Sequence, residues 1–307
     1  MSAERSSRTS AERSPRTRVG LRSVVVTGAS GGIGLVTALE LAAAGYDVIG
    51  TVRSAAKAAV VRQAAGDRGL VVRTVELDVD DPDSCAEAVV TAESMTEHGV
   101  WAWVNNAGYV QSGAVEDVSD DLVRAQLETN VVAPLRLARL VLPGMRARGE
   151  GRIVHVSSVV GRLSVPLLGW YCASKHALEA VTDALRMEVA GDGVQVVLVE
   201  PGMFGTDIWS AAQEGGFPPP GNPRYATAYA RAQNLSRRTD HLPDPVWVAR
   251  TVRMVLDNPT PTARYVVGAD AVSGILAERL LPTVVTDYVK AVAAGLRGLP
   301  ARRKPRG

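Results

Sequence analysis

SVVVTGASGGIG, at residues 23–34, joins a short apolar run to a glycine-rich turn, and a helical pattern continues from Ile33 to Ala44. The apolar run predicts a buried strand, and the pattern after it predicts a helix that ends at Gly45. Glycines between a strand and a helix let the backbone turn tightly and approach a pyrophosphate, to which the helix N-terminus offers N–H groups. The sequence therefore predicts a dinucleotide-binding turn formed by Thr27, Gly28, Ser30, Gly31, Gly32, Ile33 and Gly34.

Short apolar runs alternate with helical patterns along the rest of the chain. This alternation predicts parallel βαβ units with right-handed crossovers, and hence one doubly wound α/β domain with a seven-stranded parallel sheet flanked by helices on both faces. Pro134 is expected to bend the longest helix. The expected strands are 23–27, 47–51, 70–77, 100–105, 152–157, 194–200 and 264–267, and the expected helices are 33–44, 82–98, 119–148, 171–190 and 245–257.

Two local patterns add to this outline. The segment 207–243 is rich in glycine, proline and aromatic residues, and it follows the carboxyl end of an expected strand, where open α/β sheets bind ligands. We expect an irregular substrate lid there, with a plain surface insertion as the alternative. Trp101 and Trp103 alternate along the fourth expected strand, which predicts that both pack on one face of the sheet.

Composition limits the class of protein. The 307 residues are 46% hydrophobic, which is enough for a large core, and no run of eighteen apolar residues predicts a membrane span. Two cysteines cannot form a disulfide framework, so a reduced, cytoplasmic protein is expected. The net charge of +2 is uneven, because both ends are basic and the middle is acidic. We expect disordered basic tails at 1–20 and 297–307 around a domain at 21–296, with no nucleic-acid binding and no metal site.

The residues after the expected second and third strands bear on the choice of dinucleotide. No acidic residue lies between Val48 and Ala65, whereas Arg53 stands where an acid would otherwise hold the adenosine ribose. An arginine there can pair with a 2′-phosphate, which favours NADP(H) over NAD(H). An ordinary solvated arginine is the alternative. Further cofactor contacts are expected from Asp78 and Val79, and from Asn105, Ala107 and Gly108.

Tyr171 and Lys175 are four residues apart in an expected helix, and Ser158 lies thirteen residues before the tyrosine. Positions i and i+4 share one helix face, so the phenol and the ammonium are expected to point the same way. A nearby ammonium favours a phenolate and lowers the pKa of a tyrosine, which could then exchange a proton with a carbonyl or alcohol oxygen. The spacing alone is common on surface helices.

Taken together, these motifs resemble those of the short-chain dehydrogenase/reductase family with the T-G-x-x-x-G-x-G turn, over about residues 23–270. The glycine spacing differs from that of the extended epimerase and dehydratase branch. The resemblance implies a Rossmann fold and hydride transfer between NADP(H) and a carbonyl or alcohol. It implies Tyr171 as general acid/base, Lys175 on the nicotinamide ribose, Ser158 on the substrate oxygen, Asn130 holding a relay water, and Pro201, Gly202 and Thr206 beside the nicotinamide.

A looser resemblance concerns one branch of that family. Thr51–Arg53, Arg264–Asp270 and Leu280–Pro282 are similar to the hydroxysteroid and retinol dehydrogenases. This implies a bulky hydrophobic substrate, such as a ketone or a steroid-like, polyketide-like or retinoid-like molecule. Relatives are commonly homodimers or homotetramers, for which the helices 119–148 and 171–190 are the expected contact surfaces. The alternative function is an NADP(H)-binding regulator or scaffold without significant turnover.

Overall fold

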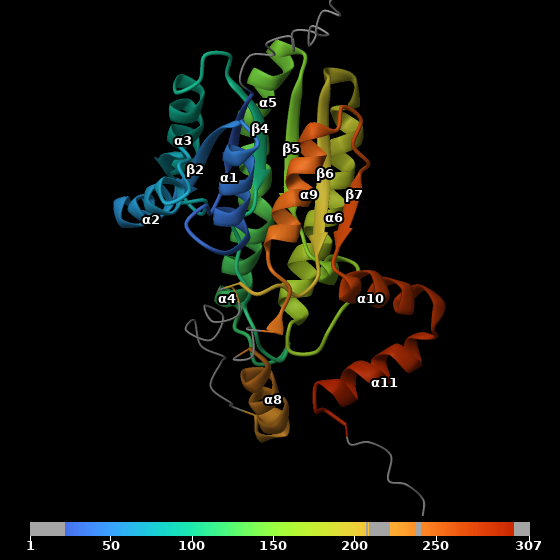
Figure 1. Cartoon of the computed structure of the whole chain (residues 1–307). Coiled ribbons are helices and arrows are strands. Elements are labelled where there is room, and N and C mark those ends of the chain that lie inside the picture. The colour runs from blue at the N-terminus through green and yellow to red at the C-terminus, as the bar shows by residue number, and fades with distance from the viewer. Residues whose placement is uncertain (1–21, 207, 209–221, 237–240, 298–307) are drawn as a thin grey trace, which may run out of the picture.

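A computed structural model describes residues 22–206, 208, 222–236 and 241–297 of the chain (Figure 1). Its strands form one parallel sheet in the order β3-β2-β1-β4-β5-β6-β7, so the expected seven-stranded doubly wound sheet is confirmed. The strands are β1 Ser23–Val26, β2 Asp47–Val52, β3 Arg73–Glu76, β4 Val100–Asn105, β5 Gly151–Val156, β6 Val194–Pro201 and β7 Arg264–Val267.

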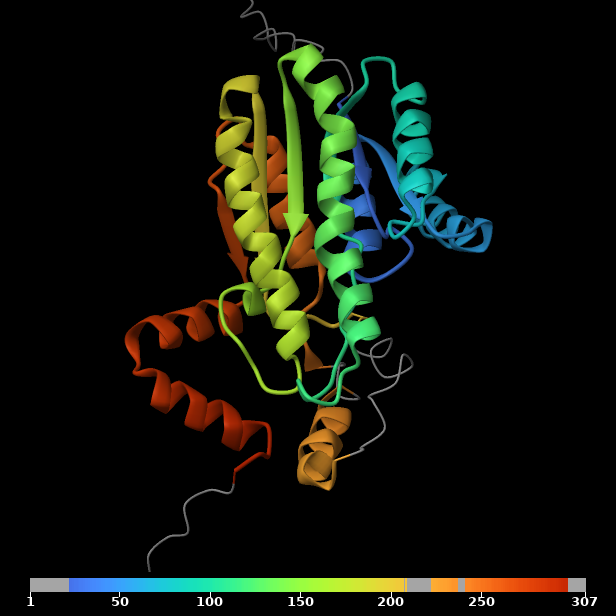
Figure 2. The same cartoon turned by 180° about the vertical axis from the view of Figure 1, so that it is seen from behind.

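Helices cover both faces of the sheet, as Figures 1 and 2 show from opposite sides. One layer is made by α1 (Gly32–Ala43), α2 (Ala55–Gly66) and α9 (Val246–Asp257), and the other by α3 (Pro82–Ser94), α5 (Ala133–Arg148) and α6 (Gly169–Glu188). The remaining elements are α4 Asp120–Leu127, η1 Glu128–Val132, η2 Val159–Gly161, η3 Ala190–Asp192, η4 Pro223–Tyr225, α8 Ala226–Ser236, α10 Ala269–Leu280 and α11 Thr283–Ala293.

The core consists of one apolar layer on each side of the sheet. Successive strand residues point to opposite faces, so Val24 and Val26 of β1 pack toward α1 and α9, while Val25 packs toward α3 and α5. All three valines are fully buried. Strands buried on both faces are continuous apolar runs, which is why SVVV carries no polar alternation.

The two tryptophans of β4 lie on opposite faces, so the expectation of a shared face is wrong. The register between β1 and β4 shifts from Ser23–Val100 to Val24–Ala102, which leaves Trp101 as an extra residue in β4. Such a bulge breaks the alternation of side chains. Trp101 stacks on Tyr46 with 6.3 Å between ring centres, on the α1 side, whereas Trp103 is buried in the layer of α3 and α5.

The long expected helix 119–148 is present as three consecutive pieces. A π-helical turn, Glu128–Val132, separates α4 from α5, and Pro134 is the second residue of α5. A proline is tolerated there because the first N–H groups of a helical segment need no intrahelical partner. The irregularity expected at Pro134 is therefore a widened turn just before it. Gly149, with φ of 68°, ends α5.

Within the described residues, four helices were not expected from the sequence: α2, α8, α10 and α11. Ser54 caps α2 by accepting the N–H of Lys57, and the alanine-rich run after it favours a helix. Within the segment expected to be irregular, residues 223–236 form η4 and α8. The rest of that expectation, at 207, 209–221 and 237–240, lies outside the described residues, as do the expected tails at 1–20 and 298–307.

Candidate active site

The glycine turn lies where the strand order reverses, between β1 and β4, which is where open α/β sheets bind ligands. Helix α1 begins after Gly31, and no side chain caps it and no acidic residue occupies its first turn. Its N–H groups are thus available to an anion. Gly28 and Gly32 have φ of 66° and 49°, and a Cβ at Gly34 would come 2.3 Å from the Gly28 carbonyl oxygen. These residues fit a dinucleotide pyrophosphate.

Thr27 joins the glycine turn to the end of β4. Its hydroxyl accepts the backbone N–H groups of Asn106 and Ala107, each at 2.9 Å, and the Asn106 amide donates to the Thr27 carbonyl at 2.9 Å. Gly108 continues this segment, and a Cβ there would come 3.0 Å from Asn130 Oδ1. Asn106, which was not expected as a site residue, therefore holds the glycine turn in place.

The residues expected around the adenosine differ in how they are placed. Arg53 directly follows β2 and is exposed, and Asp78 is exposed after β3, with its carboxylate accepting the Asp80 N–H at 3.2 Å. Val79 accepts a hydrogen bond from Arg136 through its carbonyl. Asn105 points inward: its amide accepts from Trp103 Nε1 at 3.0 Å and donates to the Pro134 carbonyl at 3.2 Å. The Asn105 side chain therefore stabilises the scaffold.

The segment after β6 lies against the glycine turn. A Cβ at Gly32 would be 3.5 Å from the Thr206 side chain, so Pro201–Thr206 faces the turn that begins α1. Asp270, at the start of α10, accepts the Met203 N–H at 2.7 Å. A Cβ at Gly202 would come 2.4 Å from the Asp270 carboxylate, which explains the glycine. Asp270 was not singled out from the sequence.

Ser158 and Tyr171 are brought together from the end of β5 and the first turn of α6. Ser158 is close enough to the phenol to favour its charged form, and the Ser158 hydroxyl donates to the Pro201 carbonyl at 3.4 Å. Tyr171 is only 6% exposed. Burial raises the pKa of Tyr171 to about 12, although Ser158 acts in the opposite direction. The phenol is therefore protonated at neutral pH in this structure.

Lys175 lies one turn after Tyr171 and is also buried. Its ammonium donates to the Val156 carbonyl at 3.0 Å and lies 5.9 Å from the centre of the Tyr171 ring. Burial lowers the pKa of Lys175 to about 8, and Glu179 opposes this shift. The expected lowering of the tyrosine pKa by the lysine is not seen here, because desolvation of the phenol outweighs other influences.

Asn130 lies in the π-helical turn between α4 and α5. Its Oδ1 accepts the Tyr109 N–H at 3.2 Å, and its Nδ2 donates to the Tyr109 carbonyl at 3.0 Å and to Ser174 Oγ at 3.1 Å. The asparagine thus contacts the neighbour of Lys175 rather than the lysine itself. π-turns are rare and occur frequently at functional sites, because the extra residue redirects a side chain.

A group of charged residues lies behind the catalytic candidates and was missed from the sequence. Glu200, at the end of β6, is fully buried and pairs with Arg162 at 3.3 Å and with Arg264 at 3.1 Å. Arg264 also pairs with Glu179 at 3.0 Å and with Asp183 at 2.5 Å, both on α6. These pairs join the segment after Ser158, the helix of Tyr171 and the strand before Pro201. We call these five residues the ion network.

Comparison with known proteins agrees with this geometry. A family model described as short chain dehydrogenase matches residues 22–215. The NADPH-dependent 3-dehydrocapnine reductase of Ornithobacterium rhinotracheale is 32% identical over 88% of this chain and 96% of that protein. Retinol dehydrogenase 5 of Homo sapiens is 31% identical over 87% and 86%. A short-chain dehydrogenase structure from Streptomyces avermitilis superposes with a TM-score of 0.71 at 32% identity, covering 90% and 97% of the chains.

The chain belongs to the short-chain dehydrogenase/reductase family. It is accordingly an oxidoreductase that uses a nicotinamide cofactor, and the alternative of a scaffold without turnover is not favoured. Among the residues that the structure describes, no helix is long and apolar enough to cross a membrane. The same residues contain no group of three or more His, Cys, Asp or Glu side chains arranged to hold a metal ion.

Proposed function

We propose that the protein is an NADP(H)-dependent oxidoreductase that reduces the carbonyl of a bulky hydrophobic substrate, with Tyr171 as the acid. The observation that carries this proposal is the buried Tyr171 beside half-buried Ser158, one helical turn from Lys175. The nicotinamide supplies the hydride when it is bound. Tyr171, whose pKa is raised to about 12, is protonated at neutral pH and can donate to the developing alkoxide. Ser158 donates a second hydrogen bond to that oxygen.

The pKa of Tyr171 bears on the direction of the reaction. Reduction needs the neutral phenol, which burial favours, whereas alcohol oxidation needs the phenolate, which burial disfavours. Lys175 is proposed to offset part of the cost of the phenolate through its positive charge. Asn130, held by Tyr109 and Ser174, is proposed to carry protons toward Lys175 through a water molecule. We therefore propose that carbonyl reduction is the faster direction at neutral pH.

The test of the acid is Tyr171→Phe, with Trp170→Phe as a matched control on the neighbouring residue. We expect turnover of a ketone panel with NADPH to fall by about a thousandfold or more in Tyr171→Phe, in line with the loss of a general acid. Cofactor affinity, measured by calorimetry, should change little. Turnover that persists in Tyr171→Phe would remove the proposed acid.

The preference for NADP(H) rests on Arg53 and on the absence of acidic residues from Val48 to Ala65. Arg53 is exposed at the end of β2, next to the N-terminus of α2, so a 2′-phosphate there would meet both a guanidinium and a helix dipole. The related 3-dehydrocapnine reductase is NADPH-dependent. Calorimetric Kd values should favour NADPH over NADH, and Arg53→Asp should reverse the order. Equal affinities in the parent protein would contradict the proposal.

The proposed hydrophobic substrate is supported by apolar groups around the catalytic end of the sheet. Tyr229 of α8 packs with Ala114 and Leu167, and its hydroxyl donates to Asp117 at 2.7 Å. We propose that α8 acts as a lid over the substrate. Retinol dehydrogenase 5 is named for a bulky apolar alcohol. Long alkyl ketones should therefore have a much lower KM than short ones. A preference for small polar ketones would contradict this substrate class.

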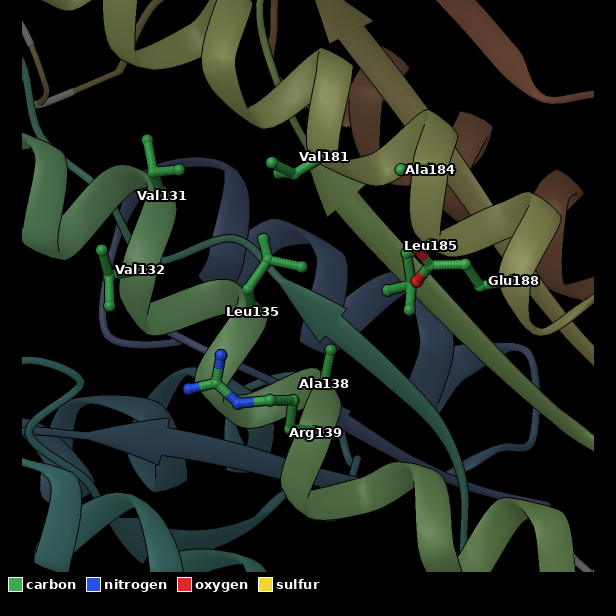
Figure 3. Close-up of a pocket in the computed structure, with 9 residues that line it drawn as sticks. All are labelled: Val131, Val132, Leu135, Ala138, Arg139, Val181, Ala184, Leu185 and Glu188. Carbon is green, nitrogen blue, oxygen red and sulfur yellow. The ribbon is translucent and has the colours of Figure 1, made fainter.

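The proposed homo-oligomer uses a groove between α5 and α6 on the surface of the sheet's second layer (Figure 3). The groove is about 440 Å³ and mostly apolar, and Val132 and Val181 are exposed beside it. It is lined by Val131, Val132, Leu135, Ala138, Arg139, Val181, Ala184, Leu185 and Glu188. Val181→Asp should lower the mass in sedimentation equilibrium, with Val60→Asp on α2 as the control. A parent protein that sediments as a monomer would contradict this proposal.

A further inference from the structure

The C-terminal arm, α10 and α11, carries an unusual share of exposed apolar side chains. Of the twenty exposed large apolar residues in the described chain, nine lie between 272 and 296. Figures 1 and 2 show the arm projecting from the body beyond the carboxyl ends of β6 and β7. Ser158 follows β5 and therefore lies at the same end of the parallel sheet. The nine are Val272, Leu276, Leu280, Leu281, Val284, Val285, Tyr288, Val289 and Leu296.

Helix α11 presents its apolar side to solvent and its polar side to the protein. At about 100° per residue, Val284, Val285, Tyr288 and Val289 fall within one arc of about 140°. Thr286 and Lys290 lie on the opposite side of the helix. A surface helix of a globular protein has the reverse arrangement, with its apolar stripe against the core.

The contacts of α11 keep this orientation in place. Lys290 donates to the Ser164 carbonyl at 3.0 Å and pairs with Glu278 of α10 at 2.5 Å. Thr286 is buried, and its hydroxyl donates to the Glu278 carboxylate of α10 at 3.5 Å. Val284 and Val289, on the outer side, are 75% and 58% exposed. An apolar surface of this kind marks a site of interaction with another apolar surface.

Helix α10, which directly precedes α11 in the chain, has an exposed apolar stripe of its own. Ala271 and Ile275 pack inward, in the cluster that contains Tyr171. Val272, Leu276 and Leu280 recur every four residues on the outer side, and Leu280 is 70% exposed at the turn into α11. The arm is therefore fixed to the catalytic end through α10 and offers an apolar surface outward.

The charge of the neighbouring sequence points to one occupant. Residues 297–307 directly follow the arm and contain five basic side chains and no acidic one. An apolar helix face followed by a basic segment supplies two signals for a membrane surface, namely burial of apolar side chains and attraction to anionic headgroups. A purely proteinaceous apolar partner would not require that run of charge.

We propose that the outer face of α10 and α11 docks on an anionic lipid surface. The protein would lie on the membrane without crossing it, and the catalytic end of the sheet would face the lipid. This docking does not depend on the identity of the substrate. It is tested by binding alone, so it can fail while the proposed reaction holds.

The experiment is flotation of the full chain with vesicles of phosphatidylcholine alone or mixed with phosphatidylglycerol. We expect flotation with the anionic vesicles only, weakened at least tenfold by high salt because salt screens the headgroups. Val284→Asp/Val289→Asp and Arg302→Gln/Arg303→Gln/Lys304→Gln should each weaken partitioning at least tenfold. Val60→Asp/Val71→Asp changes two exposed valines on the α2–β3 side and should float like the parent.

Three results would overturn the proposal. The first is a parent protein that does not float with the anionic vesicles, and the second is an α11 variant that floats as well as the parent. The third is a parent dimer in sedimentation equilibrium that Val284→Asp/Val289→Asp converts to monomer, since a second copy would then cover the face. Turnover of a dissolved ketone is measured alongside and should be unchanged in the α11 variant, which shows that the variant is folded.

Discussion

At the scale of single residues, the site combines groups whose burial opposes their charged forms. Tyr171 and Lys175 are both buried, and burial raises the pKa of the phenol and lowers the pKa of the ammonium. Each shift favours the neutral form of its own group. The arrangement therefore costs stability in the protein without its cofactor, and that cost has a defined pH dependence.

Lys175→Met should expose this cost in cofactor-free protein. The folded pKa of Lys175 is about 8 and its ordinary value is 10.5, so between these values the unfolded chain holds a proton that the folded protein has lost. Stability due to this residue therefore rises with pH through that window. In urea denaturation, the free energy of unfolding of Lys175→Met should exceed that of the parent by the largest amount below pH 8. The difference should shrink toward pH 10.5.

The same measurement can contradict the burial argument. Parallel pH dependences in the parent and in Lys175→Met would mean that the ammonium is not desolvated in the folded protein. Lys57→Met, at the N-terminal end of α2, is a suitable control because Lys57 is exposed. Its stability should follow that of the parent at every pH.

The placement of residues was predictable where a short sequence pattern decides it, while their roles stay predictions. Tyr171 and Lys175 were placed together by spacing, because a helix puts positions i and i+4 on one face whatever surrounds it, and Ser158 was taken from the motif resemblance. The direction of the Tyr171 pKa shift was not predictable, because desolvation depends on how the whole site is packed. Asn105 illustrates the same limit: its position was foreseen, but not that its side chain bonds to Trp103 and Pro134.

At the scale of elements, the ion network joins the segments that carry the catalytic candidates. Arg264 of β7 contacts Glu179 and Asp183 of α6 and Glu200 of β6. Glu200 is fully buried, so it depends on its two arginines to remain charged. The segments are therefore held together by charge as well as by the parallel strand pairs.

Arg264→Met should destabilise the protein by about 3 kcal/mol, because it leaves buried Glu200 and Glu179 without their shared cation. The measurement is the free energy of unfolding in urea. Arg253→Met is the control: Arg253 is 42% exposed in its single pair with Glu40 and should change stability by less than about 1 kcal/mol.

The network also makes a second comparison possible. Adding Glu200→Gln to Arg264→Met should recover part of the lost stability, because the buried residue no longer needs a cation. If Arg264→Met and Glu200→Gln, each made alone, are as stable as the parent, the ion network contributes nothing to holding these elements together.

Elements were predictable from the sequence when they have a clear period or apolar run. The inner strands of the described sheet were expected because strands buried on both faces are short apolar runs, whereas the edge strands β3 and β7 are only partly buried and were placed by the alternation with helices. Helices α10 and α11 were missed, and the outward direction of the apolar side of α11 is visible only in the structure. The Trp101 bulge was missed because an extra residue in one strand is visible only in the register with its neighbour.

At the scale of the whole molecule, the C-terminal arm is in direct contact with the segment that borders the proposed cofactor site. Asp270 begins α10 and accepts the Met203 N–H at 2.7 Å, within the segment proposed to border the nicotinamide. The glycine turn at the start of the chain faces the same segment through Gly32 and Thr206. Residues from opposite ends of the sequence thus form one wall of the site.

Asp270→Asn should raise the KM for the cofactor by about tenfold while kcat changes less, because a hydrogen bond to a charged acceptor is weakened in a segment that positions the cofactor. Steady-state kinetics with a fixed ketone measures both constants. Ser273→Ala, whose hydroxyl donates to the Asp270 carbonyl at 3.1 Å, is the control and should leave KM unchanged. If Asp270→Asn lowers kcat and leaves the KM for the cofactor unchanged, Asp270 has no part in cofactor binding.

The bulge in β4 has a consequence for watching this molecule unfold. Because of the extra residue, Trp101 reports on the layer of α1 and α9, while Trp103 reports on the layer of α3 and α5. Two variants that lack Trp170, Trp209 and Trp247, one retaining only Trp101 and the other only Trp103, would give each layer its own fluorescence signal. Emission transitions that coincide in denaturant would indicate one cooperative unit, and transitions that separate would reveal which layer opens first.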